Sequence, residues 1–523
     1  MKSLGIDLGT SNSVVCVYEK GDVNVVPIDG KQSVASVVYI KDGKITIGDN
    51  AKKRILLDPD NILSSTKREI GTDWSKTIEG KKYTAVDAAS MLLSYIKTKV
   101  EEEQNTTFSD VVVTIPAYFN DRQREDTQKA VGRAGFKVRR LIPEPTAAAI
   151  NYGFNRGIDQ TIAVIDLGGG TFDVSILEIE DNNFTVKAVD GNSKLGGDDF
   201  DNAISDYIFN QIEIESGKDL RSNNVARQRV KEIAEETKIE LSMSLQSEIT
   251  IAGLEPGLNL DIVLTRNEYK ELIQEYLDEI IAKINETILA AKLNADDINR
   301  FVLVGGSCKH PVVSELIKEN FREPFIARNM DTTVAEGAAT VCHSLKSPKI
   351  EGEVDNRPVI KDVIAHSLGI DTVKRGKGGL GKKSVVYTPI LEKNTHYPQK
   401  RVFIGSTQDK WQTNVQMNVF RGEDRDVKNN TMLGVLDLKI SEEHLGKNIM
   451  PIGAIFELDE SGILTFTGVE IPLSEENQFE VAALIEKHTK DNNPCYMPYE
   501  EFQPLISKYK FKTVTVKIDK SVV

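Results

Sequence analysis

The sequence predicts a two-lobed α/β domain made by internal duplication, followed by a smaller β-rich domain. Three observations predict this fold class. Two strand–turn–strand units share the residues of their turns, amphipathic helices lie between and after these units, and short alternating strands replace this pattern later in the chain. The length of 523 residues agrees, because a chain of this size exceeds what one hydrophobic core usually holds.

The duplication is visible in two hairpins. The first has strands at 4–8 and 14–18, and the second has strands at 162–167 and 172–177. Asp7 and Asp166 end the first strand of each hairpin, inside the same Asp-Leu-Gly step, and a hydroxyl residue follows closely. The repeat predicts two similar lobes whose turns carry the same chemistry.

Helix signals fill the intervals between these strands. Asn120 or Asp121 is a suitable cap, Pro145 suits a first helical turn, and Thr265 opens a capping box. Asp331 is expected to cap the last helix of the domain. The expected elements are helices at 120–135, 145–153, 265–284 and 331–344 and a strand at 301–304.

The composition changes near residue 346, where proline, glycine and polar residues predict a linker. Alternating stretches at 415–419 and 455–466 then predict β-structure, and a helix at 480–487 and a strand at 512–518 are expected near the end. The predicted boundaries are 1–346 for the duplicated domain, 347–362 for the linker, 363–470 for the β-rich domain and 471–523 for a C-terminal segment of mixed pattern.

The formal net charge of -14 argues against a general nucleic-acid binder, because an acidic surface repels phosphate. No apolar run is long enough to cross a membrane, and the N-terminus does not resemble a signal peptide. The cysteines Cys16, Cys308, Cys342 and Cys495 are far apart and form no CxxC pair. We therefore expect a cytoplasmic protein without a disulfide framework or a zinc site.

The hairpin turns carry groups that can hold a phosphate. A glycine-rich turn directs N–H groups into one concavity, and Thr10, Ser11 and Thr171 add hydroxyl donors. Asp7 and Asp166 would repel a phosphate unless a metal lies between them, and Mg²⁺ held through waters resolves this conflict. The pair predicts a metal-bound triphosphate, although each aspartate alone is equally typical of an ordinary turn.

Several stretches occur in the order found in the seventy-kilodalton heat-shock chaperones: GIDLGTSNS, VVVTIPAYFND, IPEPTAAAINYG, IDLGGGTFDVSI, LGGDDFD, ETKIELS and FVLVGGSCKHPVV. The sequence resembles this family densely over 2–345 and more loosely over 362–470. The resemblance implies an actin-like, ribonuclease H-like duplicated ATPase domain and a β-sandwich that binds peptides. It also implies ATP-driven binding and release of unfolded or specific client polypeptides. The implied ligands are ATP, ADP, Mg²⁺ and K⁺, and the implied partners are a J-domain co-chaperone and a nucleotide exchange factor.

The resemblance assigns roles to single residues by motif. The implied catalytic residues are Lys67 at the terminal phosphate, Glu144 at the attacking water, and Asp166 and Thr171. The implied metal-organising carboxylates are Asp7, Asp166 and Asp173. The implied nucleotide-binding residues are Gly9, Thr10, Ser11, Asn12, Gly168, Gly169, Gly170, Gly196, Gly197, Asp198, Glu235, Lys238, Ile239, Ser242, Gly305, Gly306, Ser307, Lys309 and Asp331. Glu235 and Lys238 would bind the ribose and Ile239 the purine, whereas spacing alone is as typical of a solvated helix face.

The resemblance also places a peptide groove in the β-sandwich. Its implied lining is Ile370, Val373, Phe403, Val415, Met417 and Val419, with the peptide held by backbone hydrogen bonds. Alternation alone favours ordinary sandwich core for these residues.

The sequence departs from the family at four places. Lys361 interrupts the apolar linker, so the sequence does not decide whether the two domains are coupled. Pro143 stands where the family usually has a polar residue, so the sequence does not decide whether the protein depends on a J-domain partner. A basic, glycine-rich loop at 374–383 is typical of a flexible loop, and the alternative is that it gives a preference for acidic flanks in the bound peptide. The helical lid is missing, so we expect fast peptide release.

Three alternatives to a coupled chaperone share the same core. One is a small-molecule kinase, the second is an actin-like scaffold that polymerises with ATP, and the third is an uncoupled family member that serves one partner.

Overall fold

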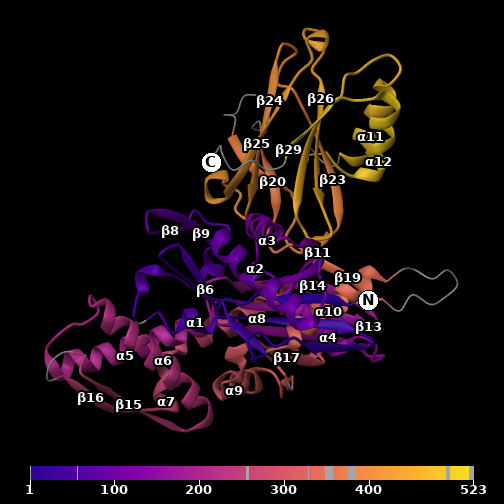
Figure 1. Cartoon of the computed structure of the whole chain (residues 1–523). Coiled ribbons are helices and arrows are strands. Elements are labelled where there is room, and N and C mark those ends of the chain that lie inside the picture. The colour runs from indigo at the N-terminus through magenta and orange to yellow at the C-terminus, as the bar shows by residue number, and fades with distance from the viewer. Residues whose placement is uncertain are drawn as a thin grey trace. The chain divides into compact units, whose positions relative to one another are not determined.

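The computed structural model describes residues 2–55, 57–254, 258–327, 329–347, 357–374, 384–489 and 495–516. The chain forms two compact units, Met1–Lys361 and Asp362–Val523 (Figure 1). Within the described ranges, no helix has both the length and the apolar character that a membrane span requires.

The first lobe of Met1–Lys361 is built on a sheet with the strand order β11–β10–β1–β2–β3, and β4 also pairs with β2. Apolar side chains of α2 and α3 pack against β1, β2 and β10 in one core. Asn120 caps α3, as predicted, and also forms a capping box with Gln123. The bounds are β1 (Ser3–Asp7), β2 (Asn12–Glu19), β3 (Asp22–Val25), β4 (Ser33–Ala35), α2 (Ala85–Gln104), β10 (Asp110–Ile115), α3 (Asp121–Arg133) and β11 (Lys137–Pro143).

A smaller group of elements is inserted between β4 and α2. It contains the short helix η2, which carries Lys67. The helix begins directly after Ser65, a residue with left-handed backbone (φ 52°). The other elements are β5 (Val38–Lys41), β6 (Lys44–Ile47), α1 (Asp49–Lys52), η1 (Pro59–Asn61), β7 (Ile62–Leu63), η2 (Thr66–Glu69), β8 (Ser75–Ile78) and β9 (Lys81–Thr84).

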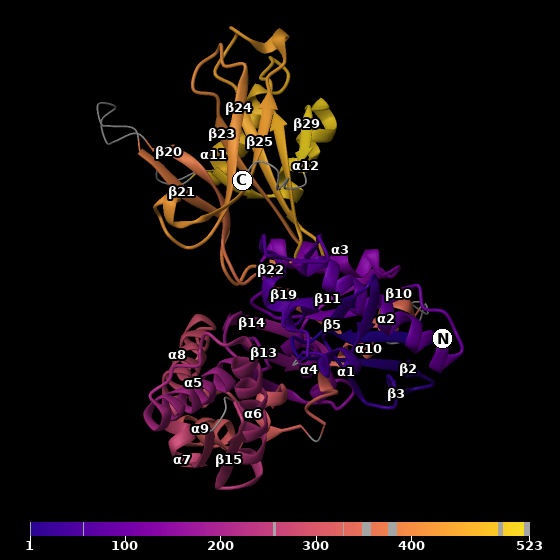
Figure 2. The same ribbon diagram turned by 60° about the vertical axis from the view of Figure 1, so that its left-hand side comes forward.

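The second lobe repeats the antiparallel hairpin of the first. Its sheet has the order β18–β17–β12–β13–β14–β19, and helices α5 to α9 contribute to one large core with it (Figure 2). The bounds are β12 (Asp159–Leu167), β13 (Phe172–Glu180), β14 (Asn183–Asn192), α5 (Gly197–Ser216), α6 (Asn224–Met243), β15 (Gln246–Ala252), β16 (Asn259–Thr265), α7 (Arg266–Leu272), α8 (Gln274–Ala290), η3 (Ala295–Asp297), β17 (Arg300–Val304), η4 (Gly306–Lys309), α9 (Pro311–Asn320) and β18 (Phe325–Ile326).

Two helices rich in small residues, α4 (Glu144–Gly153) and α10 (Thr333–Lys346), join the lobes. A Cβ atom on Gly337 of α10 would lie 1.9 Å from the carbonyl oxygen of Ala147 in α4. A Cβ atom on Gly5 of β1 would lie 2.2 Å from the backbone nitrogen of Ala339. Glycine is therefore required at both crossings, because any side chain would push the backbones apart.

Two sequence predictions in this unit need correction. The last helix begins after Thr332, not after Asp331, because the Asp331 carboxylate instead forms an ion pair with Lys309. The helix predicted from Thr265 is two helices, α7 and α8, which meet at the buried Ile273, where the backbone leaves helical values (φ −104°, ψ 10°).

The predicted linker is partly a strand. Val359–Lys361, the first part of β19 (Val359–Val363), pairs in parallel with Asn183–Thr185 of β14. Main-chain hydrogen bonds determine this pairing, so the polar Lys361 does not prevent it. Residues 348–356 of the predicted linker lie outside the described residues.

Asp362–Val523 is a β-sandwich of two sheets, with the orders β21–β20–β24–β25 and β28–β23–β26–β27–β29. Side chains from both sheets form its core. The rest of β19 pairs with β22. The bounds are β20 (Leu368–Lys374), β21 (Ser384–Leu391), β22 (His396–Tyr397), β23 (Gln399–Ser406), β24 (Asn414–Arg421), η5 (Val427–Asn429), β25 (Thr431–Lys439), η6 (Glu442–His444), β26 (Pro451–Leu458) and β27 (Leu464–Glu470). Residues 375–383 of the predicted basic loop lie outside the described residues.

The C-terminal segment completes the second sheet. Strand β28 (Cys495–Pro498) pairs with β23, and β29 (Thr513–Val516) pairs with β27, so this segment supplies the strand at each end of the sheet. Helices α11 (Gln478–His488) and α12 (Tyr499–Tyr509) pack on the same sheet through Val481, Phe502 and Leu505 (Figure 1). Sequence reasoning missed β28 and α12.

Candidate functional site

The turns of the two duplicated hairpins meet in Met1–Lys361. A Cβ atom on Gly169 would lie 2.2 Å from Oγ of Ser11, and one on Gly170 would lie 2.6 Å from Cγ2 of Thr10. The two predicted phosphate loops are thus in contact, and glycine is needed for this approach.

The second loop is held from behind by main-chain and side-chain donors. The N–H groups of Gly197 and Asp198 donate to the carbonyl oxygens of Gly168 (3.0 Å) and Gly169 (2.7 Å). Oγ of Ser307 donates to the carbonyl of Gly168 at 2.8 Å. These bonds place the N-terminus of α5 and the turn after β17 beside the loop.

Two further glycines allow these close approaches. A Cβ atom on Gly196 would lie 2.6 Å from the nitrogen of Gly170. Gly305 has a left-handed backbone (φ 86°), and a Cβ atom there would lie 2.5 Å from Oδ1 of Asp166. Gly306 continues this turn as the first residue of η4 and has open space around it.

Arg68 is a residue that sequence reasoning missed. Its Nε donates to the carbonyl of Gly170 at 2.9 Å, and its guanidinium pairs with Asp199 at 2.6 Å. Asp199 also accepts the N–H of Gly196 at 2.8 Å. Arg68 therefore fixes the second loop, and its position directly after Lys67 was the available signal.

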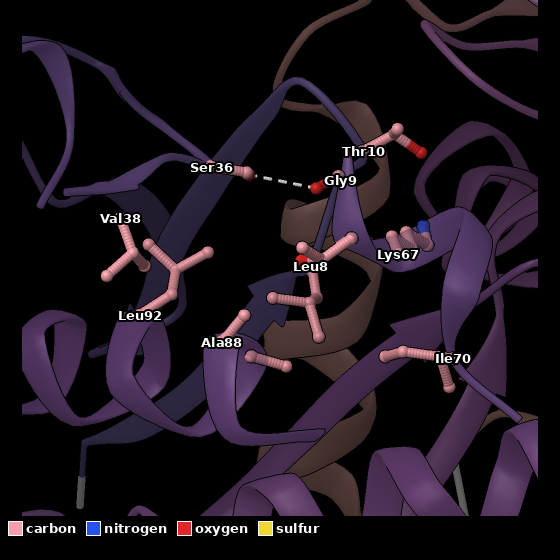
Figure 3. Close-up of a pocket in the computed structure, with 11 residues that line it drawn as sticks. Leu8, Gly9, Thr10, Ser36, Val38, Lys67, Ile70, Ala88 and Leu92 are labelled. Carbon is pink, nitrogen blue, oxygen red and sulfur yellow. Dashed lines mark hydrogen bonds between the residues drawn. The ribbon is translucent and has the colours of Figure 1, made fainter. Parts of the chain in front are cut away.

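The first loop is fixed by the residue that follows β4. Oγ of Ser36 donates to the carbonyl of Gly9 at 2.9 Å (Figure 3). A Cβ atom on Gly9 would lie 2.0 Å from the carbonyl oxygen of Asn12, which explains the tight turn. A cavity of about 20 Å³ between this loop, Lys67 and the apolar residues of α2 has room for about one water molecule.

Lys67 and Glu144 form a buried ion pair. Nζ of Lys67 lies 2.5 Å from Oε1 of Glu144, and each side chain is 7% exposed. Burial opposes the positive charge on Lys67, but Glu144, Asp7 and Asp166 together raise its pKa above the ordinary lysine value. The ammonium group is therefore charged beside the two phosphate loops, where it can stabilise anionic oxygen atoms.

Three aspartates surround this pair, and burial raises the pKa of each. The pKa of Asp7 rises to about 7 because of burial and the nearby Glu144, although Lys67 and the hydroxyl of Thr114 (2.9 Å from Oδ1) oppose the rise. The pKa of Asp166 is raised well above its ordinary value by burial and by Glu144, Asp173 and Asp7. One ammonium thus stands among four carboxylates, an excess of negative charge.

Asp173 faces Asp166 across the hairpin and is 1% exposed. Burial and the charge of Glu144 raise its pKa to about 7. Its Oδ1 accepts the N–H of Tyr118 at 2.8 Å, but its buried Oδ2 has no hydrogen-bond partner. An unpaired buried oxygen in a cluster of carboxylates fits a cation or its water shell.

The same cluster limits how a metal could be held. In the described part of the chain, no three His, Cys, Asp or Glu side chains are close enough to coordinate one ion together. The residues present therefore fit Mg²⁺ held largely through waters and phosphate oxygens, which is the usual preference of this ion.

The residues predicted to hold the nucleoside lie on α6 and nearby, and several are already paired. Nζ of Lys238 contacts Asp201 at 2.7 Å and donates to the carbonyl of Gly197 at 3.0 Å. Glu235 pairs with Lys52 of α1 at 3.1 Å. Ile239 is 52% exposed, as expected for a residue that offers an open apolar contact.

The other residues predicted to contact the nucleotide are also bonded to neighbouring residues. Oγ of Ser242 donates to the carbonyl of Ile239 at 2.6 Å. Lys309 and Asp331 form an exposed ion pair at 2.5 Å. Asp198 accepts a hydrogen bond from Ser65 at 3.2 Å, which joins the start of α5 to the loop before Lys67.

The predicted groove residues separate into two groups. Four of them are buried in the core between the two sheets, as the alternating pattern of the sequence alone favoured: Ile370, Phe403, Met417 and Val419. Val373 is 45% exposed and Val415 is partly buried. Only these two of the six have side chains that a bound peptide could reach directly.

Comparison with known protein families is consistent with this architecture. A family model described as Hsp70 protein matches residues 3–503, which is nearly the whole chain and includes both units. Members of this family are ATP-dependent chaperones in general, with an actin-like ATPase domain and a substrate-binding domain. The chain belongs to the Hsp70 family.

Proposed function

We propose that this chain binds and hydrolyses ATP between the lobes of Met1–Lys361 and uses the nucleotide state to control how Asp362–Val523 binds client polypeptides. One observation carries the proposal. The buried pair Lys67–Glu144 lies with Asp7 and Asp166 directly beside two touching glycine loops. Phosphoryl transfer needs such an arrangement of a cation, donors and a carboxylate.

Each group of site residues has a separate role in the proposed hydrolysis. The N–H groups and hydroxyls of the loops that contain Thr10 and Thr171 hold the phosphates. Lys67 stabilises the oxygens of the terminal phosphate as its bond loosens, while Glu144 orients the water that attacks in line. When bound, Mg²⁺ would supply charge neutralisation, and Asp7, Asp166 and Asp173 would hold its waters and, we propose, K⁺.

Nucleoside binding would exchange existing ion pairs for ligand contacts. Lys238 and Glu235 are bonded to Asp201 and Lys52, so each must share or exchange this partner to reach ribose hydroxyls. Lys309 and Asp331 are paired in the same manner. Because Lys52 and Glu235 belong to different lobes, we propose that a bound nucleoside also affects how closely the lobes approach.

For the client side, we propose that Val373 and Val415 contact an extended apolar segment of the client. The expected partners remain a J-domain co-chaperone and a nucleotide exchange factor. Strand β19 is the proposed route of coupling, since its first residues pair with β14 of Met1–Lys361, the proposed ATPase domain, which we call the ATPase unit.

Calorimetry and ATP turnover with Mg²⁺ test the proposal. Asp7→Asn and Asp166→Asn should each lower turnover by about 100-fold, because the metal-bound triphosphate loses a carboxylate. Asp42→Asn is the matched control, since Asp42 is exposed, has left-handed backbone (φ 51°) that asparagine tolerates, and lies in a remote turn. Wild-type turnover in both aspartate variants would refute the proposed site.

Two further measurements separate the alternatives. Stimulation of turnover by apolar peptides supports a chaperone, whereas stimulation by sugars supports a small-molecule kinase. Sedimentation that depends on ATP would instead support a polymerising scaffold.

A further inference from the structure

A second pocket lies in the second lobe, and the proposed ATP site does not use it. It has a volume of about 340 Å³, which is within the range typical of small-ligand sites. Its walls come from the end of α4, the chain that follows it, the start of β17, and β18. The lining residues are Tyr152, Arg156, Ile158, Arg300, Glu323, Pro324 and Phe325.

The pocket is distant from the nucleotide site although it shares elements with it. Helix α4 has Glu144 at its first turn and Tyr152 at its last, and the helical rise separates these by about 12 Å. Strand β17 likewise begins with Arg300 at the pocket and ends before Gly305 at the phosphate loops. The same two elements therefore connect both sites.

The pocket carries uncompensated positive charge. Arg156 and Arg300 are exposed, and neither takes part in an ion pair or a side-chain hydrogen bond among the described residues. The one acidic residue of the lining, Glu323, pairs with Lys318 at 2.6 Å. Two guanidinium groups without a described partner in one pocket favour an anionic ligand.

The lining also has an apolar and aromatic part. The rings of Tyr152 and Phe325 lie edge to face, with centroids 5.1 Å apart. The hydroxyl of Tyr152 donates to Gln160 at 3.0 Å, which fixes the ring, and Phe325 is 38% exposed. With Ile158 and Pro324, this part can receive an apolar group, and such a surface close to cations suits a ligand with both characters.

We propose that this pocket binds a carboxylate carried on an apolar body, with Arg156 and Arg300 on the carboxylate and Tyr152 and Phe325 on the body. A guanidinium group matches the planar carboxylate through paired hydrogen bonds. The same chemistry occurs in a free hydrophobic acid and in the C-terminal residue of a polypeptide. Either source would place its carboxylate between the two arginines.

Calorimetry on the full-length protein in low salt tests this inference. The probes are N-acetylphenylalanine, its methylamide, and an eight-residue peptide ending in phenylalanine with a free or an amidated terminus. Both free acids should bind at least tenfold more tightly than their amides, because the amides lack the charge. Tighter binding of the peptide acid identifies a polypeptide terminus as the ligand, and equal or tighter binding of the small acid identifies a free acid.

The variants distinguish this pocket from any peptide site in the β-sandwich. Arg156→Gln with Arg300→Gln should weaken binding of the free acids at least tenfold and remove the preference over the amides. Arg227→Gln, an exposed arginine on α6, should leave both unchanged. Equal affinity for acid and amide, equal affinity in wild type and the double variant, or no binding of either acid would overturn the inference. The proposed ATP site is tested separately, since none of these residues belongs to it.

Discussion

Replacing Asp173 with asparagine should stabilise the ATPase unit while removing its proposed function. Asp173 is 1% exposed, and its pKa rises to about 7 from an ordinary value of 3.8. A carboxyl group whose pKa is raised in the folded state stabilises the fold below its unfolded pKa, and this stabilisation is lost as the pH rises to 7. The difference between about 7 and 3.8 corresponds to about 4 kcal/mol, at about 1.36 kcal/mol per pKa unit.

Without nucleotide and metal, Asp173→Asn should therefore raise the free energy of unfolding by about 4 kcal/mol at pH 8. At pH 5 the gain should fall to less than half of this value, because the folded wild type is then protonated. The asparagine oxygen can still accept the N–H of Tyr118. ATP turnover should be lost, since the neutral side chain no longer attracts a cation.

Urea unfolding followed by tryptophan fluorescence measures this change. The chain has two tryptophans, Trp74 in the ATPase unit and Trp411 in the β-sandwich unit. In a Trp411→Phe background, Trp74 alone reports on the ATPase unit, and the 65% exposure of Trp411 makes this replacement mild. Asp42→Asn serves as the control. Unchanged stability at pH 8, or a gain that is equal at pH 5 and pH 8, would refute the argument.

Three further predictions concern packing and acid sensitivity. Gly337→Ala should lower the free energy of unfolding by about 3 kcal/mol or more, since its Cβ would lie 1.9 Å from the carbonyl oxygen of Ala147. The control Gly132→Ala, in the open last turns of α3, should raise the free energy of unfolding by about 0.5 kcal/mol. Thermal denaturation of both variants measures these changes. Phe502→Ala should destabilise the β-sandwich unit by about 3–5 kcal/mol in urea titrations followed by the fluorescence of Trp411. Phe479 is 78% exposed, so Phe479→Ala should not change this stability, and equal effects of the two variants would contradict the packing. Burial lowers the pKa of His310, the N-cap of α9, to about 4. The neutral imidazole therefore stabilises the fold fully above pH 6.5, and this contribution of about 3 kcal/mol is lost as the pH falls to 4. The stability difference between wild type and His310→Asn should change by that amount over this pH range, and parallel pH profiles would contradict the assignment.

The sequence predicted the hairpins and most helices of the ATPase unit because their signals are local. The Asp-Leu-Gly steps, the cap at Asn120, the capping box at Thr265, and the period of the apolar residues all depend on residues close together in the chain. Lys67 could be chosen only from the family resemblance, because its partner Glu144 is distant in sequence.

What could not be predicted depends on long-range packing. Pro504 lies inside α12 and is typical of a helix end, so the pattern around Phe502 did not indicate a helix. Alternation in β24 shows which residues share a face, but it cannot distinguish a closed core from an open groove. The burial of Met417 and Val419 therefore had to come from the structure.

The pairing of the C-terminal segment with both ends of one sheet has a consequence for synthesis. Strand β23 is complete at Ser406, but its neighbour β28 begins only at Cys495. In the same way, β27 ends at Glu470, but its neighbour β29 spans Thr513–Val516. While the ribosome is still adding these residues, the ATPase unit can already fold, whereas β23 and β27 of the sandwich each pair only with β26 and keep one unpaired edge. The newborn chain thus exposes the kind of surface on which chaperones act.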